Sequence, residues 1–164
     1  MGRAPTNTIG GGRDQTAVIG HAPEHRDWTP NMPSWEPFIA DAVRIEAYVT
    51  IDAGMKAPTF IGARTWLMKH CHIGHDAVIG ADCELSPGVV VCGHASIGAR
   101  TRVGVNACVL PGVRVGTDVV IGAGAVVTKN IPAGETWTGN PARNLHEPVE
   151  DCRVNGRVFD YDAT

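Results

Sequence analysis

The amino-acid sequence predicts an all-β protein, a parallel β-helix built from short stacked strands. Three observations support this expectation. Aliphatic residues recur every six positions over a long central segment, and a small or β-branched residue recurs four positions after each of them. The 164 residues include 20 glycines and only 5% aromatic residues, yet 43% are hydrophobic. A core of this composition is made of small aliphatic side chains carried by strands and turns.

The six-residue repeat runs from Val43 to Pro132. The aliphatic places are occupied by Val43, Val49, Met55, Ile61, Leu67, Ile73, Ile79, Leu85, Val91, Ile97, Val103, Val109, Val115, Ile121 and Val127. The second places are occupied by Ala47, Ala53, Thr59, Thr65, Cys71, Ala77, Cys83, Val89, Ala95, Thr101, Ala107, Val113, Val119, Ala125 and Ile131. Each hexad would supply one strand, with both patterned residues inside, and one corner permitted by Gly, Asp or Asn. A period of six without an insertion is typical of parallel β-helices and argues against ordinary antiparallel strands.

The chain divides into three parts around this repeat. Residues 1–42 are rich in Gly and Pro and do not fit the hexad register, so we expect an irregular N-terminal arm with one short strand at 16–20. Residues 43–132 form the hexapeptide-repeat β-helix, and residues 133–164 form a closing segment and a short tail. A length of 164 residues fits this organisation as one domain.

Charge and hydropathy exclude several classes of function. The net charge of −3 argues against binding to nucleic acid and against attachment to an anionic membrane. No apolar run approaches the roughly 20 residues that span a bilayer, and the first residues lack the apolar stretch of a signal peptide. The five cysteines are odd in number and show no C-x-x-C spacing, as expected of free thiols in a reducing compartment. We therefore expect a cytoplasmic protein.

The hexads resemble those of the hexapeptide-repeat acyltransferases. This resemblance implies a left-handed parallel β-helix with three hexads in each triangular coil, and therefore about five coils. Residues 18 positions apart then lie one above the other on neighbouring coils. His75 is expected beneath Gly93, and Asp76 beneath His94. An imidazole next to a carboxylate at a corner is suited to general-base chemistry, because it accepts a proton near neutral pH.

The string LMKHCHIGHDAVIG at residues 67–80 resembles the catalytic coil of two branches of that family. One is the UDP-N-acetylglucosamine O-acyltransferase of lipid A synthesis, and the other is the group of sugar acetyltransferases acting on amino sugars and sialic acids. The resemblance implies that His75 is the general base, that Asp76 orients it and that the Gly93 N–H stabilises the oxyanion. It also implies that His94 and His72 contact the acceptor.

The same resemblance implies an acyl donor and an assembly. The donor would be acetyl-CoA, held by backbone near Val105 and Ala123, and no metal is expected. The segment at residues 133–143 resembles the closing segment of the acetyltransferase branch. That branch carries a second His nine residues after the base, where this chain has Glu84, a candidate substrate contact. The family forms homotrimers with active sites between subunits. We expect an acetyl-CoA-dependent acyltransferase acting on a hydroxyl or amine of a sugar, a nucleotide-sugar or a similar small acceptor.

Two other functions stay open. The γ-class carbonic anhydrases share the fold and use two zinc-binding histidines five residues apart, the spacing of His70 and His75. Their third histidine would fall at Ser34, and a catalytic zinc needs three protein ligands. The second function is that of a non-catalytic β-helix subunit that serves assembly, although such a subunit has no need of a base beneath an oxyanion site.

Two further pairs of residues carry expectations. Tyr48 and Trp66 are 18 residues apart, so we expect them to stack on one outer column, as a subunit contact or as a platform for an acceptor. His21 and His25 lie in the arm, where they either reach an acceptor or are mobile surface residues.

Overall fold

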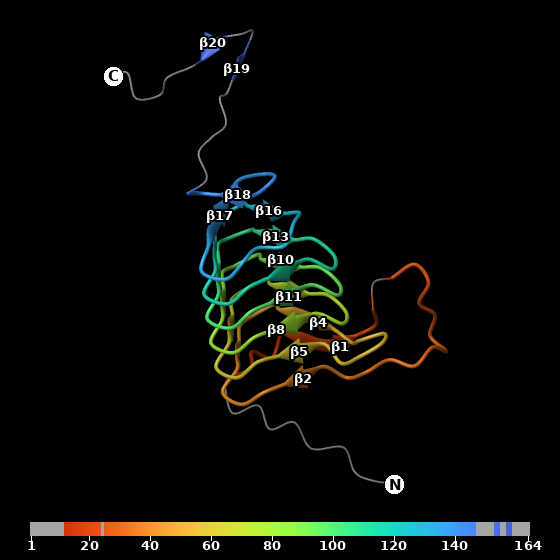
Figure 1. The fold of residues 1–164 in the computed structure, drawn as a ribbon. Helices are drawn as coiled ribbons and strands as arrows, with labels where there is room; N and C mark the ends of the chain where they lie inside the picture. The colour runs from red at the N-terminus through yellow and green to blue at the C-terminus, as the bar shows by residue number, and fades with distance from the viewer. Residues whose placement is uncertain (1–11, 24, 147–152, 155–156, 159–164) are drawn as a thin grey trace.

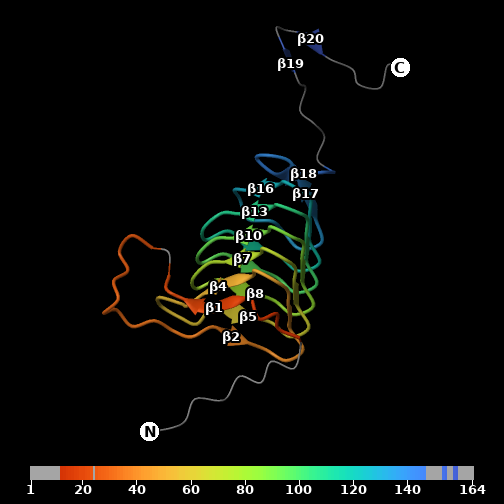
Figure 2. The ribbon, with the colours of Figure 1, turned by 180° about the vertical axis from the view of Figure 1, so that it is seen from behind.

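All regular structure is β-strand in the computed structural model, which describes residues 12–23, 25–146, 153–154 and 157–158. The strands stack into three faces of a solenoid (Figures 1 and 2). Face 1 contains β1 (Val18–His21), β4 (Thr50–Asp52), β7 (His72–Ile73), β10 (Val90–Val91), β13 (Cys108–Val109) and β16 (Val126–Val127). Face 2 contains β2 (Phe38–Ile39), β5 (Phe60–Ile61), β8 (Val78–Ile79), β11 (Ser96–Ile97) and β14 (Arg114–Val115). Face 3 contains β3 (Arg44–Ile45), β6 (Trp66–Leu67), β9 (Glu84–Leu85), β12 (Arg102–Val103), β15 (Val120–Ile121), β17 (Thr136–Thr138) and β18 (Arg143–Asn144).

The topology confirms the predicted fold class. Each turn of the chain gives one short strand to each face, and neighbouring turns pair in parallel, as Val90 does with His72 and with Cys108. The stack has about six turns and is consistent with a left-handed β-helix. The strands β19 (Arg153–Val154) and β20 (Arg157–Val158) pair antiparallel in a separate sheet. No helix in the described residues is long and apolar enough to cross a membrane.

The predicted hexad register is wrong for the residues before 58. Thr50 pairs with His72, four residues farther along the chain than the 18-residue step that joins His72 to Val90. The extra residues form a loop around 54–57 that interrupts the repeat. Ile39, Ile45 and Ile51 therefore occupy the inner aliphatic place, while Met55 lies in the loop and is only half-buried.

The corners explain two features of the sequence. The left-handed backbone conformation falls three places after most inner aliphatic residues, at His70, Asp76 and His94 among others, with φ between 56° and 61° at these three. Asp and His tolerate this region better than bulky or β-branched residues. The glycine directly after the aliphatic residue has another purpose: a Cβ at Gly62 would lie 2.5 Å from the Ala81 nitrogen of the next coil. Gly62 therefore permits close approach of the coils rather than the corner itself.

The arm is attached to the first turns by strand pairing. The predicted strand near 16–20 is present as β1, which pairs in parallel with β4 at the edge of face 1. The chain then projects beyond the coils, in orange in Figure 1, and returns at β2. On the way back Trp35 pairs with Gly54 in an antiparallel bridge, at the start of the inserted loop. Both ends of the projecting segment are therefore fixed beside that loop.

Candidate active site

A cavity of about 490 Å³ lies at the corner where the chain passes from face 1 to face 2. Its lining residues are His25, Asp52, His72, Gly74, His75, Val90, Cys92, Gly93, His94 and Pro111. Four of these are histidines, and they come from the coils and from the arm. The cavity therefore gathers His72, His75, Gly93 and His94, which the sequence places on neighbouring coils.

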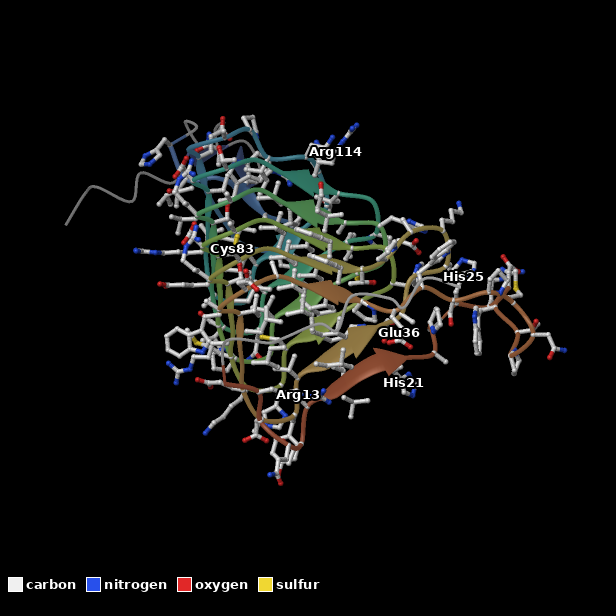
Figure 3. All side chains as sticks on the ribbon, turned by 90° about the horizontal axis from the view of Figure 1, so that it is seen from below. Arg13, His21, His25, Glu36, Cys83 and Arg114 are labelled. Atoms are coloured by element: carbon white, nitrogen blue, oxygen red, sulfur yellow. The ribbon has the colours of Figure 1, made fainter. Side chains whose placement is uncertain are left out.

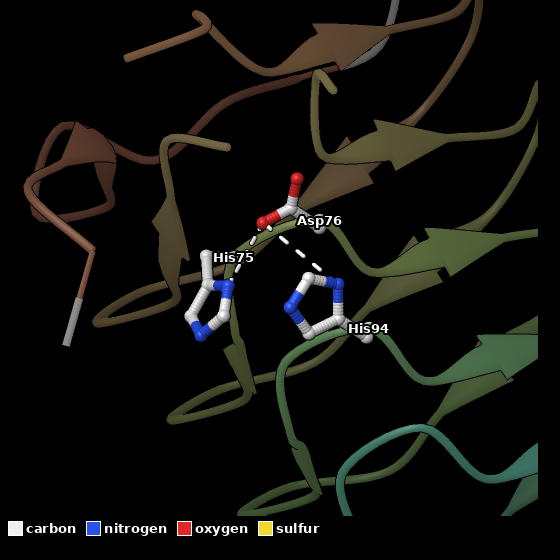
Figure 4. A group of neighbouring side chains, drawn as sticks. All are labelled: His75, Asp76 and His94. Atoms are coloured by element: carbon white, nitrogen blue, oxygen red, sulfur yellow. Dashed lines mark hydrogen bonds and ion pairs between the residues drawn. The ribbon is translucent and has the colours of Figure 1, made fainter. Parts of the chain in front are cut away.

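His75 lines the cavity and is paired with Asp76, the next residue along the chain (Figure 4). The Nδ1 atom of His75 lies 2.9 Å from Oδ2 of Asp76. A carboxylate only accepts hydrogen bonds, so Nδ1 carries the proton and the neutral ring keeps its lone pair on Nε2. The His75 residue is 7% exposed, so the pair is largely shielded from water. This tautomer is the one that can take a proton through Nε2.

The inserted loop holds Asp76 in place. The backbone N–H groups of Lys56 and Ala57 donate to Oδ1 at 2.7 and 2.8 Å, and that of Met55 donates to Oδ2 at 3.0 Å. Burial raises the pKa of Asp76, but the hydrogen bonds from His75 and from these amides outweigh it and lower the pKa to about 2. Asp76 is therefore ionised at neutral pH and is fixed independently of His75.

Gly93 lies directly against the free edge of the His75 ring. A Cβ at Gly93 would be 2.5 Å from Nε2 of His75, so a side chain there would displace the ring. The Gly93 N–H donates to no acceptor in the described part of the chain, whereas its carbonyl accepts from Gly112 at 3.1 Å. An unpaired N–H next to a free imidazole nitrogen is the arrangement needed to meet an oxyanion.

His94 lies against this pair, and His72 lines the same cavity. The His94 ring packs edge-on against the His75 ring, with centroids 4.9 Å apart, and its Nδ1 lies 4.0 Å from Oδ2 of Asp76. The His72 Nδ1 lies 2.8 Å from Oγ1 of Thr50, and its Nε2 lies 3.9 Å from Oδ2 of the buried Asp52. Both rings line the cavity, where they can contact a bound molecule.

The other three predicted site residues lie outside the cavity of their own chain. Val105 and Ala123 lie at the corner between faces 3 and 1, where the Gly124 N–H donates to the Val105 carbonyl at 2.8 Å. The Val105 side chain is exposed. Glu84 lies on β9 of face 3 and faces Arg102, with 3.7 Å between Oε2 and Nε. Within one chain, Glu84 therefore does not reach the site.

The residues expected for a carbonic anhydrase do not come together. His70 lies at the corner between faces 3 and 1, where its ring stacks on Tyr48 with centroids 5.0 Å apart. His75, Asp76 and His94 are the one group in the described residues with the spacing to hold a metal ion. Each Asp76 oxygen already accepts two hydrogen bonds, so a metal would have to displace some of them.

Three parts of the site escaped the sequence analysis. The inserted loop was hidden because Met55 fits the aliphatic pattern. Asp52 and Cys92 line the cavity but belong to no recognised motif. The sequence offered one signal for the loop, since Gly54 and Pro58 bracket it and both residue types favour turns.

Comparison with known proteins agrees with the fold and the repeat. Residues 58–93 match the bacterial transferase hexapeptide (six repeats) family, and residues 94–129 match the hexapeptide repeat of succinyl-transferase. A UDP-3-O-acylglucosamine N-acyltransferase from a Caulobacter species is 35% identical over 65% of this chain and 32% of its own length.

Two solved structures are similar over most of the chain. The UDP-N-acetylglucosamine O-acyltransferase of Moraxella catarrhalis has a TM-score of 0.76 and 32% identity over 79% of this chain and 51% of its own. A perosamine N-acetyltransferase mutant of Caulobacter crescentus, solved with CoA and GDP-perosamine, has a TM-score of 0.68 and 26% identity over 85% of this chain and 58% of its own. The chain thus spans about a third to just over half of the length of these relatives. Residues 58–129 match hexapeptide repeats of transferases, as the periodicity of the sequence predicts.

Proposed function

We propose that the protein is an acyltransferase that moves an acetyl group from acetyl-CoA to a hydroxyl or amine of a sugar or nucleotide-sugar. The observation that carries the proposal is the His75 ring, which is fixed by an ionised Asp76 on one edge and faces the side-chain-free Gly93 on the other. The similar proteins act on, or bind, sugar nucleotides, as their names state.

His75 acts as the general base in this proposal. Nε2 takes the proton from the acceptor's hydroxyl or amine as its oxygen or nitrogen attacks the thioester carbonyl carbon. The carbonyl oxygen becomes an oxyanion that accepts a hydrogen bond from the Gly93 N–H. When the tetrahedral intermediate collapses, the carbon–sulfur bond breaks. CoA then leaves as its thiol, with the proton returned by the His75 imidazolium, and His75 is neutral again.

The transfer is direct, without an acyl-enzyme. Cys92 is a potential nucleophile in the cavity, but burial and the neighbouring Cys108 raise its pKa to about 11. A thiol acts as a nucleophile through its thiolate, which is scarce at neutral pH when the pKa is high. The acceptor itself therefore attacks the donor, and the kinetics should be sequential rather than ping-pong.

The donor is expected along the corner that carries Val105 and Ala123. The Val105 side chain is exposed there, on a column of small residues that leaves room for a narrow pantetheine chain. This corner is one face away from the cavity of the same chain, so a neighbouring copy is needed to bring the donor and Glu84 near a His75. We therefore propose a cytoplasmic homotrimer of about 52 kDa, built from 17.3 kDa chains with sites between them.

The test is release of free CoA from acetyl-CoA in the presence of amino sugars, nucleotide-sugars and small amines. Longer acyl-CoA thioesters and an acyl carrier protein thioester serve as competing donors. Acceptor-dependent thiol release from acetyl-CoA, with a trimer in analytical ultracentrifugation, is the expected result. A preference for the carrier protein would correct the donor, and the absence of acceptor-dependent release with any donor would refute the proposed function.

A further inference from the structure

The N-terminal arm places a fourth histidine in the catalytic cavity. His25 lies on the projecting segment after β1, at the side of the coils (Figure 3), and it lines the cavity together with His75. The His25 and His75 rings meet edge to face, with centroids 5.5 Å apart and planes at 87°. His75 is therefore flanked by His25 from the arm as well as by His94 from the next coil.

The backbone around His25 determines which ring nitrogen carries its proton. The Asp27 N–H donates to Nδ1 of His25 at 3.2 Å, so the neutral ring is protonated on Nε2. In the described part of the chain, no hydrogen bond joins His25 Nε2 to another group. His25 thus presents an unused N–H donor in a cavity where the His75 Nε2 presents a lone pair.

Backbone hydrogen bonds shape the segment around His25 and attach its two ends to the coils. The His25 N–H donates to the Pro23 carbonyl at 2.9 Å, and the Trp28 N–H donates to the His25 carbonyl at 3.0 Å. Farther out, the Ala53 N–H donates to the His21 carbonyl at 2.8 Å. The antiparallel bridge from Trp35 to the chain beside the inserted loop holds the other end. These contacts argue against a mobile surface histidine.

We propose that His25 is an acceptor-binding residue whose Nε2–H donates a hydrogen bond to an oxygen next to the group that is acylated. This inference rests on the proposed function and specifies its acceptor: a compound with an oxygen on the carbon beside the reacting hydroxyl or amine, as in a sugar ring. The His75 Nε2 takes the proton from the reacting group, and the His25 Nε2–H holds the neighbouring oxygen. Two imidazoles packed edge to face can engage two adjacent heteroatoms of one sugar ring, so the arm contributes to acceptor recognition.

The test compares His25→Ala with His25→Gln, which keeps an N–H donor near the position of Nε2, and with His21→Ala as the matched control. His21 lies in the same arm but does not line the cavity. Each variant is assayed with acetyl-CoA and the best acceptor among glucosamine, UDP-N-acetylglucosamine and GDP-perosamine. A second assay follows the slow hydrolysis of acetyl-CoA without acceptor, in which water replaces the acceptor and yields acetate and CoA.

Loss of one hydrogen bond to the acceptor should raise its KM about tenfold in His25→Ala. The KM for acetyl-CoA and the hydrolysis rate should stay at the parental values, as should all constants of His21→Ala. His25→Gln should recover most of the loss. A deoxy analogue that lacks the neighbouring oxygen should bind to the parent more weakly than the complete acceptor does. This analogue should bind equally well to the parent and to His25→Ala.

An unchanged acceptor KM in His25→Ala would overturn this inference while leaving the proposed function intact. An equal loss of transfer and hydrolysis would also overturn it, because His25 would then act through His75 rather than on the acceptor. A parent protein that shows no acceptor-dependent release of CoA with any acceptor of the full panel and any donor would refute the proposed function, and this inference with it.

Discussion

The regular coils at residues 60–127 and the irregular N-terminal part at residues 12–58 contribute to the cavity in different ways. In the coils every parallel pairing steps by 18 residues, and the pattern of inner residues repeats. In the N-terminal part the step lengthens through the inserted loop, and the arm leaves the stack and returns. The coils carry His75, Gly93 and His94, while the irregular part carries the three amides that hold Asp76 and the ring of His25.

This difference shows how a repeat protein acquires a specific site. The repeat places side chains at predictable heights, but the same corner recurs in every coil, and the cavity described above lies at one of these corners. Within the regular coils at residues 60–127, the N–H at the place of Gly93 is also unpaired at each of the other corners where the residue has an N–H. The site is distinguished by what the irregular part adds beside one corner. The following experiments test this division between the two regions, beginning with the largest expected effect.

Removal of the base should have the largest effect on activity. His75→Ala should lower turnover by roughly 10²–10⁴-fold, the usual contribution of a general base, because the His75 ring is the imidazole that lies against Gly93. Steady-state rates with acetyl-CoA and the best acceptor measure the change. His70→Ala is the control, since His70 also lies at a corner of the coils but stacks on Tyr48 outside the cavity. Near-parental turnover of His75→Ala would assign the proton transfer to another residue.

Overpacking of the regular coils should affect stability. Ala77 and Ala95 are fully buried at the inner place of neighbouring coils. Ala77→Leu or Ala95→Leu should lower the free energy of unfolding by about 1–3 kcal/mol, since close-packed interiors accept added methylenes only with strain. Urea denaturation measures the loss, and Val78→Leu on the exposed outer face is the control. Unchanged stability in both inner variants would contradict the inner register.

Disruption of the inserted loop should affect catalysis more than stability. Lys56→Pro removes the N–H that donates to Oδ1 of Asp76 at 2.7 Å, whereas Lys56→Ala removes only the side chain. We expect Lys56→Pro to lower kcat about tenfold, because second contacts that orient a catalytic group commonly matter to that extent. Lys56→Ala should behave like the parent. Equal losses in the two variants would mean that the side chain, rather than the amide, is what the site requires.

The six-residue spacing, together with the three hexads per coil that the family resemblance implies, was sufficient to predict the regular part. Residues 18 apart lie together in the coils, so the contacts of His75 with Gly93 and of Asp76 with His94 follow from counting along the sequence. The inner places after residue 58 are buried as predicted. Periodicity is a strong signal here because each coil is stabilised by the same inward side chains and the same strand pairing as its neighbours.

Counting failed where the insertion shifts the register. The prediction that Tyr48 stacks with Trp66 is wrong: Tyr48 stacks on His70, and Trp66 packs under the Arg44 guanidinium, 4.3 Å from the ring centroid. The hydrogen bonds that fix Asp76 could not be predicted either, because they come from backbone N–H groups, which every residue type except proline possesses. Contacts made by the backbone of an irregular loop leave no residue pattern in the sequence.

The smallest effect expected is a difference in acid sensitivity between two aspartates, one from each kind of environment. Asp76 has a native pKa of about 2, below the ordinary 3.8, because the hydrogen bonds that it accepts outweigh its burial. A carboxylate with a depressed native pKa stabilises the fold above its ordinary pKa and loses that contribution as pH falls toward the native value. The stability gap between the parent and Asp76→Asn should therefore be constant above about pH 5 and narrow between about pH 4 and 2.

Asp82 also has a lowered pKa, through the hydrogen bond from Arg64, but it lies at an exposed corner of the regular coils where water screens the pair. Asp82→Asn should change stability little at any pH. Urea denaturation of the three proteins from pH 2 to 7 measures both gaps, and a gap for Asp82 as large as that for Asp76 would show that the inserted loop gives its aspartate no special hold.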